Sequence, residues 1–151
     1  MKKVIIILGI GLVIAIGTIY YMFNMSKRDV QNTEVDYKIE ATSLVNEYLT
    51  DVSSANAKYL QEDGDSKIIA VSGTVYSIDE DLNQQQVVLL QENNDNAGVS
   101  CTFMQSTNVN AQSLSKGDHT TIKGVIRSGA SYDEDLEMYE NVIIEKCDII
   151  Q

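Results

Sequence analysis

Residues 4–25 form a run of 22 residues without a charged side chain, and this run constrains the chain more than any other feature. Basic pairs border it at residues 2–3 and 27–28. A helix of this length rises about 33 Å, which is enough to cross a hydrocarbon core of about 30 Å. Tyr20 and Tyr21 stand near one end, where aromatic rings prefer the membrane interface. The run therefore predicts an N-terminal transmembrane helix.

Two other interpretations of the run are open. Ala15-Ile16-Gly17 offers the small residues of a signal-peptide cleavage site, although cleavage there would leave an apolar new N-terminus. A lipid anchor would need a cysteine beside the run, and none stands there. We favour an uncleaved anchor at residues 1–28. Because the free amino terminus adds positive charge to the short tail, we predict a single-pass protein of the cell membrane with its remaining chain outside the cytoplasm.

Beyond the anchor the chain is strongly acidic. Residues 29–151 carry all 22 Asp and Glu but only 7 of the 11 Lys and Arg, which gives a net formal charge of −15. Lys and Arg supply most of the affinity of proteins for nucleic-acid phosphates, so this composition disfavours a nucleic-acid partner. A cationic protein, peptide, small molecule or divalent ion suits the charge better.

The first part of this acidic region predicts a tether and a helix. Residues 29–38 are polar and lack periodicity, as expected of a tether. Over residues 39–60 apolar side chains recur at steps of three and four, which is typical of an amphipathic helix. They are Leu44, Val45, Tyr48, Leu49 and Val52. We expect a break or kink at residues 53–56 and a turn at residues 61–66.

After the turn, the apolar period changes to two, as in β-strands. Gly73 predicts a bulge or bend in the first strand. One helix followed by five short strands predicts a mainly β fold, a small closed barrel, because closure removes exposed strand edges. The strands are predicted over residues 67–78, 86–91, 99–103, 119–127 and 138–149, with a helical turn near Ala111 and a loop at residues 128–135.

Five stretches together carry a family resemblance. They are A-N-A-K-Y-L at 55–60, A-V-S-G-T-V at 70–75, G-V-S-C-T-F at 98–103, L-S-K-G-D-H-T-T-I-K-G at 114–124 and V-I-I-E-K-C-D-I at 142–149. Over residues 39–150 the chain resembles the tRNA_anti-like family, although Thr120 replaces an apolar residue of its pattern. The resemblance implies a five-stranded Greek-key OB-fold barrel preceded by an α-helix, here residues 39–151, in an anchored bacterial envelope protein. It implies no particular activity.

An OB barrel has its usual ligand face between two loops, one joining strands one and two and one joining strands four and five. Both loops are acidic here, and nearby tyrosines could serve as stacking platforms. If this face binds a ligand, we predict that the ligand is cationic; the alternative is that the acids are hydrophilic loop tips. The candidate residues are Tyr76, Asp79, Glu80, Asp81, Tyr132, Asp133, Glu134, Asp135 and Tyr139.

Two cysteines, Cys101 and Cys147, fall on the third and fifth predicted strands, which are neighbours in an OB barrel. A disulfide would form if their Cα atoms lie within about 7 Å and the compartment is oxidising. The alternative is that two buried thiols pack as small hydrophobic groups.

No motif in the sequence indicates catalysis, a metal or a cofactor. His119 is the only histidine and lacks the clustered ligands of a zinc site. No nucleophile motif or Gly-rich phosphate loop occurs. We therefore predict a non-enzymatic, membrane-anchored binding or assembly module for a protein or peptide. The alternative is a small molecule, glycan or divalent cation at the acidic loops, whereas nucleic-acid binding follows from fold analogy alone.

Overall fold

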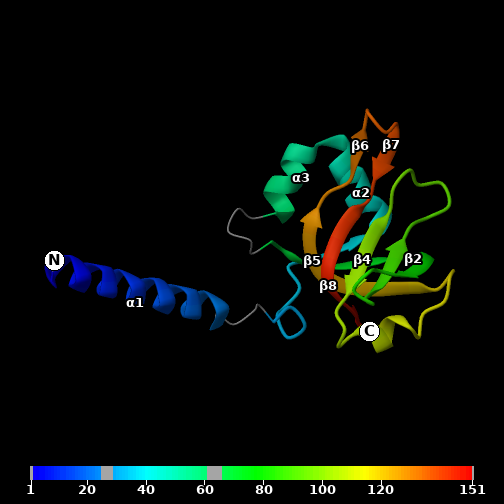
Figure 1. Ribbon diagram of the computed structural model, residues 1–151. Coiled ribbons are helices and arrows are strands. Elements are labelled where there is room, and N and C mark those ends of the chain that lie inside the picture. The colour runs from blue at the N-terminus through cyan, green and yellow to red at the C-terminus, as the bar shows by residue number, and fades with distance from the viewer. Residues whose placement is uncertain (1, 25–28, 61–65, 151) are drawn as a thin grey trace.

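The computed structural model describes residues 2–24, 29–60 and 66–150, without the side chains of residues 2–10 and 24 (Figure 1). The basic flank at residues 27–28 and all but the last residue of the predicted turn at 61–66 lie outside the described residues. The N-terminal run forms helix α1, Lys2–Asn24, whose side chains at residues 11–23 are exposed. Across the described residues, no helix is both long and apolar enough to cross a membrane. The anchor stays a prediction.

Five strands close into a barrel, as predicted. In order around it they are β2 (Ile68–Glu80), β3 (Gln86–Leu90), β4 (Val99–Phe103), β8 (Val142–Ile150) and β5 (His119–Ser128), and β5 pairs back onto β2. The β4–β8 pair is parallel, and its neighbours in the barrel pair antiparallel. The short helix α4 (Asn108–Ala111) follows β4, where one helical turn is expected.

Alternation along the strands fills the barrel. On β4 the side chains of Val99, Cys101 and Phe103 are buried, whereas Ser100 and Thr102 are partly exposed. A side chain of this kind contributes about 1.5–3 kcal/mol when it is fully buried. The period of two therefore sets both the core and an outward polar surface.

The predicted helix is two helices, α2 (Ala41–Thr50) and α3 (Val52–Tyr59). The break lies at Asp51, earlier than expected, because the Asp51 carboxylate accepts a hydrogen bond of 3.0 Å from the backbone N–H of Ser54 and caps α3. Tyr48 and Tyr59 are fully buried, and their rings stack with centroids 6.0 Å apart. Both helices thus join the barrel core.

Two short strands are additional to the prediction, and a third is the separated start of the last predicted strand. β1 (Tyr37–Glu40) pairs in parallel with β2, within the region expected to be tether and helix. β6 (Ser131–Asp133) and β7 (Met138–Glu140) form a separate hairpin that projects at the top of Figure 1. The hairpin ends at Asn141, whose side chain accepts a hydrogen bond of 2.8 Å from the Gly98 backbone N–H. The predicted strand at 138–149 is consequently split in two.

The sequence predicts a bulge or bend at Gly73, and the bulge does not lie at this residue. The register between β2 and β3 shifts farther along, between Val75 and Ser77. A β-carbon at Gly73 would lie 3.0 Å from the Ala41 β-carbon and 3.3 Å from that of Leu90. The glycine instead allows α2 to approach the strand closely.

Residues 29–36, which we name the strap, lie on the barrel and do not form the free tether expected of them. Val30 is only 2% exposed. Lys123 on β5 is 6% exposed, and its Nζ donates hydrogen bonds to the backbone carbonyls of Gln31, at 3.0 Å, and Thr33. The buried ammonium group of Lys123 therefore holds the strap against β5.

Further contacts hold both parts of the strap. The Gln31 side-chain amide donates to the backbone carbonyl of Lys146 on β8, at 2.6 Å. The Asp36 backbone N–H donates to the Ile68 carbonyl at 2.7 Å, and the Asp36 carboxylate accepts from the Ile68 N–H at 2.8 Å. Together these hydrogen bonds attach the strap, which follows α1 in the chain, to the three barrel strands β2, β5 and β8.

Candidate ligand-binding face

The acidic turn between β2 and β3 is shaped by its own carboxylate. Asp81 accepts hydrogen bonds of 2.8 Å from the backbone N–H groups of both Asn83 and Gln85. Asp79 accepts one from the Ser77 hydroxyl, at 3.0 Å. Among the predicted ligand residues, Asp81 therefore has a structural role as well. Glu80, at the end of β2, accepts from the Gln86 side chain at 3.3 Å.

The β6–β7 hairpin carries the second group of predicted residues. Tyr132 and Tyr139 lie opposite each other with ring centroids 4.9 Å apart, and both are exposed. Asp133 accepts hydrogen bonds from the backbone N–H groups of Asp135, at 2.8 Å, and Leu136, at 2.9 Å. Asp133 thus orders the tip, as Asp81 orders the other turn.

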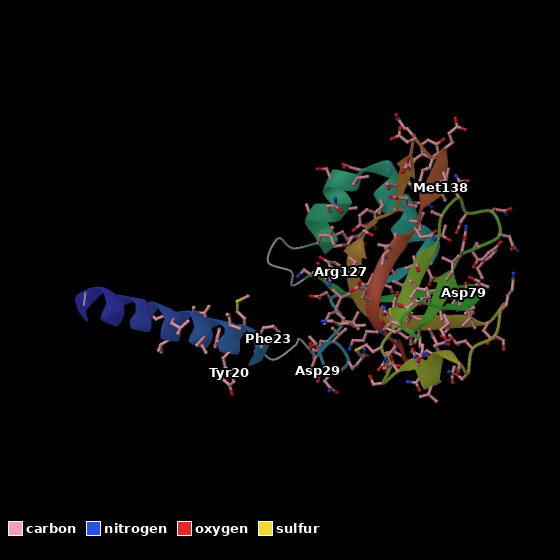
Figure 2. All side chains as sticks on the ribbon, viewed as in Figure 1. Tyr20, Phe23, Asp29, Asp79, Arg127 and Met138 are labelled. Atoms are coloured by element: carbon pink, nitrogen blue, oxygen red, sulfur yellow. The ribbon has the colours of Figure 1, made fainter. Side chains whose placement is uncertain are left out.

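Strand register separates the two acidic groups. One end of the barrel surface lies at the turn between β2 and β3, and we call it the turn end. Asp79 lies there opposite Val87, and Val87 pairs with Thr102 on β4. The hairpin end begins where Val142 pairs with Val99. In Figure 2, Asp79 and Met138, the first residue of β7, lie on separate parts of the domain. The predicted residues thus stand at opposite ends of one surface.

The surface between these ends is the outward side of β3, β4 and β8. Leu89, Ser100 and Ile143 form one row across it, because each pairs with the next. A second row, nearer the turn, contains Thr102 and, on β8, Glu145. We name the outward surface of the parallel pair the β4–β8 face.

A cavity lies at each end of the β4–β8 face. The hairpin-end cavity has a volume of about 240 Å³ and is lined by Ser100, Ser128, Glu140, Asn141 and Ile143. The turn-end cavity has a volume of about 320 Å³ and is lined by Asp81, Asn83, Gln85, Thr102, Met104, Glu145 and Lys146. Only Asp81 among the predicted residues lines either cavity. The alternation of apolar and polar residues along β8 could have indicated that Glu145 points outward. Its position in a cavity follows only from the pairing of β8 with β4.

The ring of Tyr76, another predicted stacking platform, is covered by a side chain of the same protein. It is the extra residue where the β2–β3 register shifts, and it is 41% exposed. The Lys116 ammonium lies 4.6 Å from the centroid of its ring, in a cation–π contact. A stacking ligand would have to displace this lysine.

Most cations of the domain have internal partners. Arg127 donates through Nε to Glu145 at 2.9 Å, and Lys67 lies 3.6 Å from Asp36. Lys123 is bonded to the strap. Because these positive charges are already engaged, they offer little to a polyanion.

The model of the tRNA_anti-like family matches residues 1–135. The chain belongs to the tRNA_anti-like family. This confirms the resemblance drawn from the sequence, and the closed barrel is the OB-type barrel expected of it. Comparison with curated proteins finds no significant match.

Two solved structures are similar to this tRNA_anti-like chain to different degrees. A crystal structure of a lipoprotein from Klebsiella pneumoniae subsp. pneumoniae MGH 78578, provisionally described as nucleic acid-binding, matches with a TM-score of 0.55 and 14% identity. The match covers 83% of this chain and 100% of that one. RecG bound to a three-way DNA junction matches with a TM-score of 0.33 and 11% identity, over 91% of this chain and 21% of that one. Because the TM-score of the RecG match is only 0.33, only the likeness to the Klebsiella protein bears on the fold.

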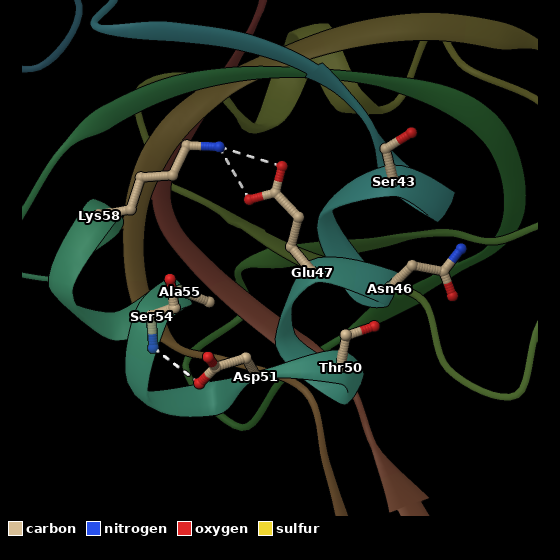
Figure 3. Close-up of a pocket in the computed structure, with 8 residues that line it drawn as sticks. All are labelled: Ser43, Asn46, Glu47, Thr50, Asp51, Ser54, Ala55 and Lys58. Atoms are coloured by element: carbon tan, nitrogen blue, oxygen red, sulfur yellow. Dashed lines mark hydrogen bonds and ion pairs between the residues drawn. The ribbon is translucent and has the colours of Figure 1, made fainter.

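A separate groove in the tRNA_anti-like domain lies between α2 and α3 and has a volume of about 570 Å³ (Figure 3). Two of the residues that line this groove, Glu47 and Lys58, form an ion pair with each other. Lys58 donates to both oxygens of Glu47, at 3.0 and 2.8 Å, and the Tyr59 hydroxyl donates to the same carboxylate at 2.9 Å. The hydrogen bond from Lys58 is the main reason that the pKa of Glu47 is lowered. This pair clamps α2 to α3.

The two cysteines are buried, free thiols on the neighbouring strands β4 and β8. Cys101 lies opposite Ile144, whereas Cys147 lies opposite Phe103, so the thiols are diagonal neighbours. Burial, together with the adjacent Cys101 thiol, raises the pKa of Cys147 well above its ordinary value. Packing of the two thiols as small hydrophobic groups and a disulfide formed in an oxidising compartment both stay hypotheses.

No metal centre stands out in the part of the chain that the structure describes, because no group of three or more His, Cys, Asp or Glu side chains there is arranged to hold an ion. His119 is exposed, and its Nε2 lies 4.0 Å from Glu40. Glu134 and Asp135 at the hairpin tip are exposed.

Proposed function

We propose that the protein is a membrane-anchored, extracytoplasmic OB-fold module that binds a cationic protein or peptide on the β4–β8 face. The observation that carries the proposal is the position of the carboxylates. Glu140 lines the hairpin-end cavity, and Asp81 and Glu145 line the turn-end cavity. A cationic side chain that enters either cavity meets opposite charge at close range.

The anchor is supported by the apolar run of α1 and its basic flanks. The Klebsiella protein of similar fold is described as a lipoprotein, and a membrane location of this chain would agree with that description. Extraction of cell membranes at alkaline pH, with antibody against the C-terminus, tests the anchor, since an embedded chain stays in the pellet. Protease added to intact spheroplasts should digest the domain if it lies outside the cytoplasm. Survival of the domain until the cells are lysed would reverse the topology.

Nucleic-acid binding is the second candidate, because the Klebsiella relative is provisionally described as a nucleic acid-binding protein. Charge opposes it here. A phosphate on the β4–β8 face would meet Glu140, Glu145 and Asp81, while Arg127 and Lys123 are engaged with internal partners. Non-specific affinity for nucleic acid comes from neutralised phosphates, so we expect little of it.

A direct comparison of ligands tests the two candidates. The full chain in detergent is titrated into a fluorescein-labelled peptide rich in Lys and Arg and, separately, into labelled single-stranded DNA of similar length. We expect the peptide anisotropy to rise, and the affinity to fall with added salt. Glu145→Gln should weaken binding, whereas Glu34→Gln, which removes the same charge from the strap, should not. Salt-dependent retention of the DNA, with no response to the peptide, would overturn the proposal.

The small-ligand alternative has its own readout. Both cavities are at or below the lower end of the range of about 300–1,000 Å³ that small-molecule sites occupy. A thermal-shift series with divalent ions and sugars should therefore leave the unfolding temperature unchanged. A saturable increase with one of them would favour a small ligand instead.

A further inference from the structure

We propose that the ligand of the β4–β8 face is an extended peptide segment with two basic side chains at positions i and i+2, one in each cavity. This inference rests on the proposed function and specifies its ligand. It follows from the register of β4 and β8 and from the charge of each cavity.

The spacing comes from the strands beneath the face. Ser100 lines the hairpin-end cavity and Thr102 lines the turn-end cavity. On β8, Ile143 and Glu145 are divided between the same two cavities. Two residues along a strand cover about 6.6 Å, and in an extended peptide the side chains i and i+2 also share one face at about that spacing. A segment lying along β4 would therefore place alternate side chains in the two cavities.

The charge of each cavity suits one cation. Glu140 is the single ionisable residue lining the hairpin-end cavity, and its carboxylate also accepts a hydrogen bond from the Ser131 hydroxyl. The turn-end cavity contains Asp81 and Glu145 against Lys146, a net formal charge of −1. Two separate single charges match two separated side chains better than one dense polycation.

Polar groups around the carboxylates favour arginine at these positions. The hairpin-end cavity offers the hydroxyls of Ser100 and Ser128, and the turn-end cavity offers the Thr102 hydroxyl and the Asn83 amide. A guanidinium presents five N–H donors in a planar fork and can use a carboxylate together with such neutral acceptors. Ile143, which is 40% exposed, lines the hairpin-end cavity with Glu140 and can contact the aliphatic stem of an arginine there.

One group on the protein competes with the ligand. Arg127 donates to one oxygen of Glu145, at 2.9 Å, and it does not line the cavity. A ligand cation must share Glu145 with it. Removing the Arg127 charge should therefore strengthen binding at the turn end, a result that a purely structural role of Arg127 does not predict.

The test uses the full chain in detergent and three labelled peptides of equal length and charge, with two arginines at spacings i+1, i+2 and i+3 in an otherwise uncharged sequence. We expect the i+2 peptide to bind about three- to fivefold more tightly than the others, the scale of one exposed ion pair. The substitutions Glu140→Gln and Glu145→Gln should each reduce the affinity for the i+2 peptide to the affinity expected for a peptide with one arginine. Arg127→Gln should increase its affinity, and Glu34→Gln should change nothing.

The outcomes separate this inference from the proposed function. Equal binding of all three spacings, still weakened by Glu145→Gln, would overturn the i+2 ligand and leave the cationic-peptide module in place. Absence of binding by every peptide would overturn both. Thermal unfolding of each variant identifies loss of fold, and the three-peptide comparison on the unaltered chain needs no variant at all.

Discussion

The ring of Tyr48 lies against the backbone of Gly129 so closely that a β-carbon at position 129 would stand 1.9 Å from Cδ1 of the tyrosine. Tyr48 belongs to α2, and Gly129 is the residue that leaves β5 toward the β6–β7 hairpin. The contact therefore joins the helices to the loop that carries one end of the candidate face.

Gly129→Ala should destabilise the domain strongly, because the added methyl group must displace a fully buried ring. Overpacking of a core typically costs about 1–3 kcal/mol, and we expect the upper end or more here. Chemical denaturation of the full chain in detergent measures the loss. Gly17→Ala is the matched control, since its β-carbon meets nothing within 4 Å. Equal stability of the two variants would contradict this packing.

Tyr48→Phe and Tyr59→Phe should have different effects. The Tyr48 hydroxyl is buried and, within the described residues, has no hydrogen-bond partner. Its removal should leave stability unchanged or raise it by up to about 1 kcal/mol, because an unpaired buried hydroxyl is itself costly. The Tyr59 hydroxyl donates to Glu47 at 2.9 Å, so its removal should cost about 1 kcal/mol. A loss at Tyr48 as large as that at Tyr59 would indicate a partner for the first hydroxyl.

Alkaline pH provides a related prediction. Burial raises the pKa of Tyr48 from 10.0 to about 12. The folded state therefore keeps this proton after the unfolded state has lost it. The contribution of this group to the free energy of unfolding is fully present below pH 10 and falls as pH rises toward 12. The loss attributable to this group is at most about 1.4 kcal/mol per pH unit. Denaturation of the wild type and Tyr48→Phe across this range should show a steeper decline in the wild type.

Lys123→Met should release the strap. The variant keeps an aliphatic side chain but removes the donor that bonds to the Gln31 and Thr33 carbonyls. We expect faster amide exchange and faster proteolysis within residues 29–36, with little change in the barrel strands. Lys116→Met is the control, because Lys116 contacts the Tyr76 ring and not the strap. Unchanged protection of the strap would show that Val30 and Asp36 are sufficient to hold it.

The buried thiols should resist alkylation in the folded chain. Cys101 and Cys147 are fully buried, and burial raises the pKa of Cys147, which disfavours the reactive thiolate. Mass spectrometry after iodoacetamide treatment should show no adduct on the native chain and two after unfolding without reductant. Two adducts only when reductant is present would instead establish the disulfide that the sequence leaves open.

The sequence predicts the barrel well because alternation is local. Cys101 and Phe103, two residues apart, already indicate an inward face of β4, and both are fully buried. Short or interrupted elements lack such a signal. β1 has four residues and only one of them is partly buried, and the break at Asn141 depends on a hydrogen bond to Gly98, distant in sequence. Capping by Asp51 likewise outweighs the continuous helical pattern.

The candidate site was partly predictable for the same reason. The acids of both turns are visible in the sequence, and each group lies at one end of the β4–β8 face. Glu145 on β8 and Glu140, the last residue of β7, line the cavities beside β4. The pairing of β8 with β4 joins residues more than forty positions apart. Local patterns do not contain that register.

Docking of the strap limits how far the domain can move from α1. Residues 25–28 alone separate Asn24 from Asp29, where the strap begins, and the five steps from Asn24 to Asp29 span at most about 18 Å when extended. If α1 is embedded in a membrane, the barrel stays at the bilayer surface and samples a thin layer rather than a wide hemisphere. Partners confined to the same membrane would then meet it at high effective concentration, whereas soluble ones would have to approach the lipid.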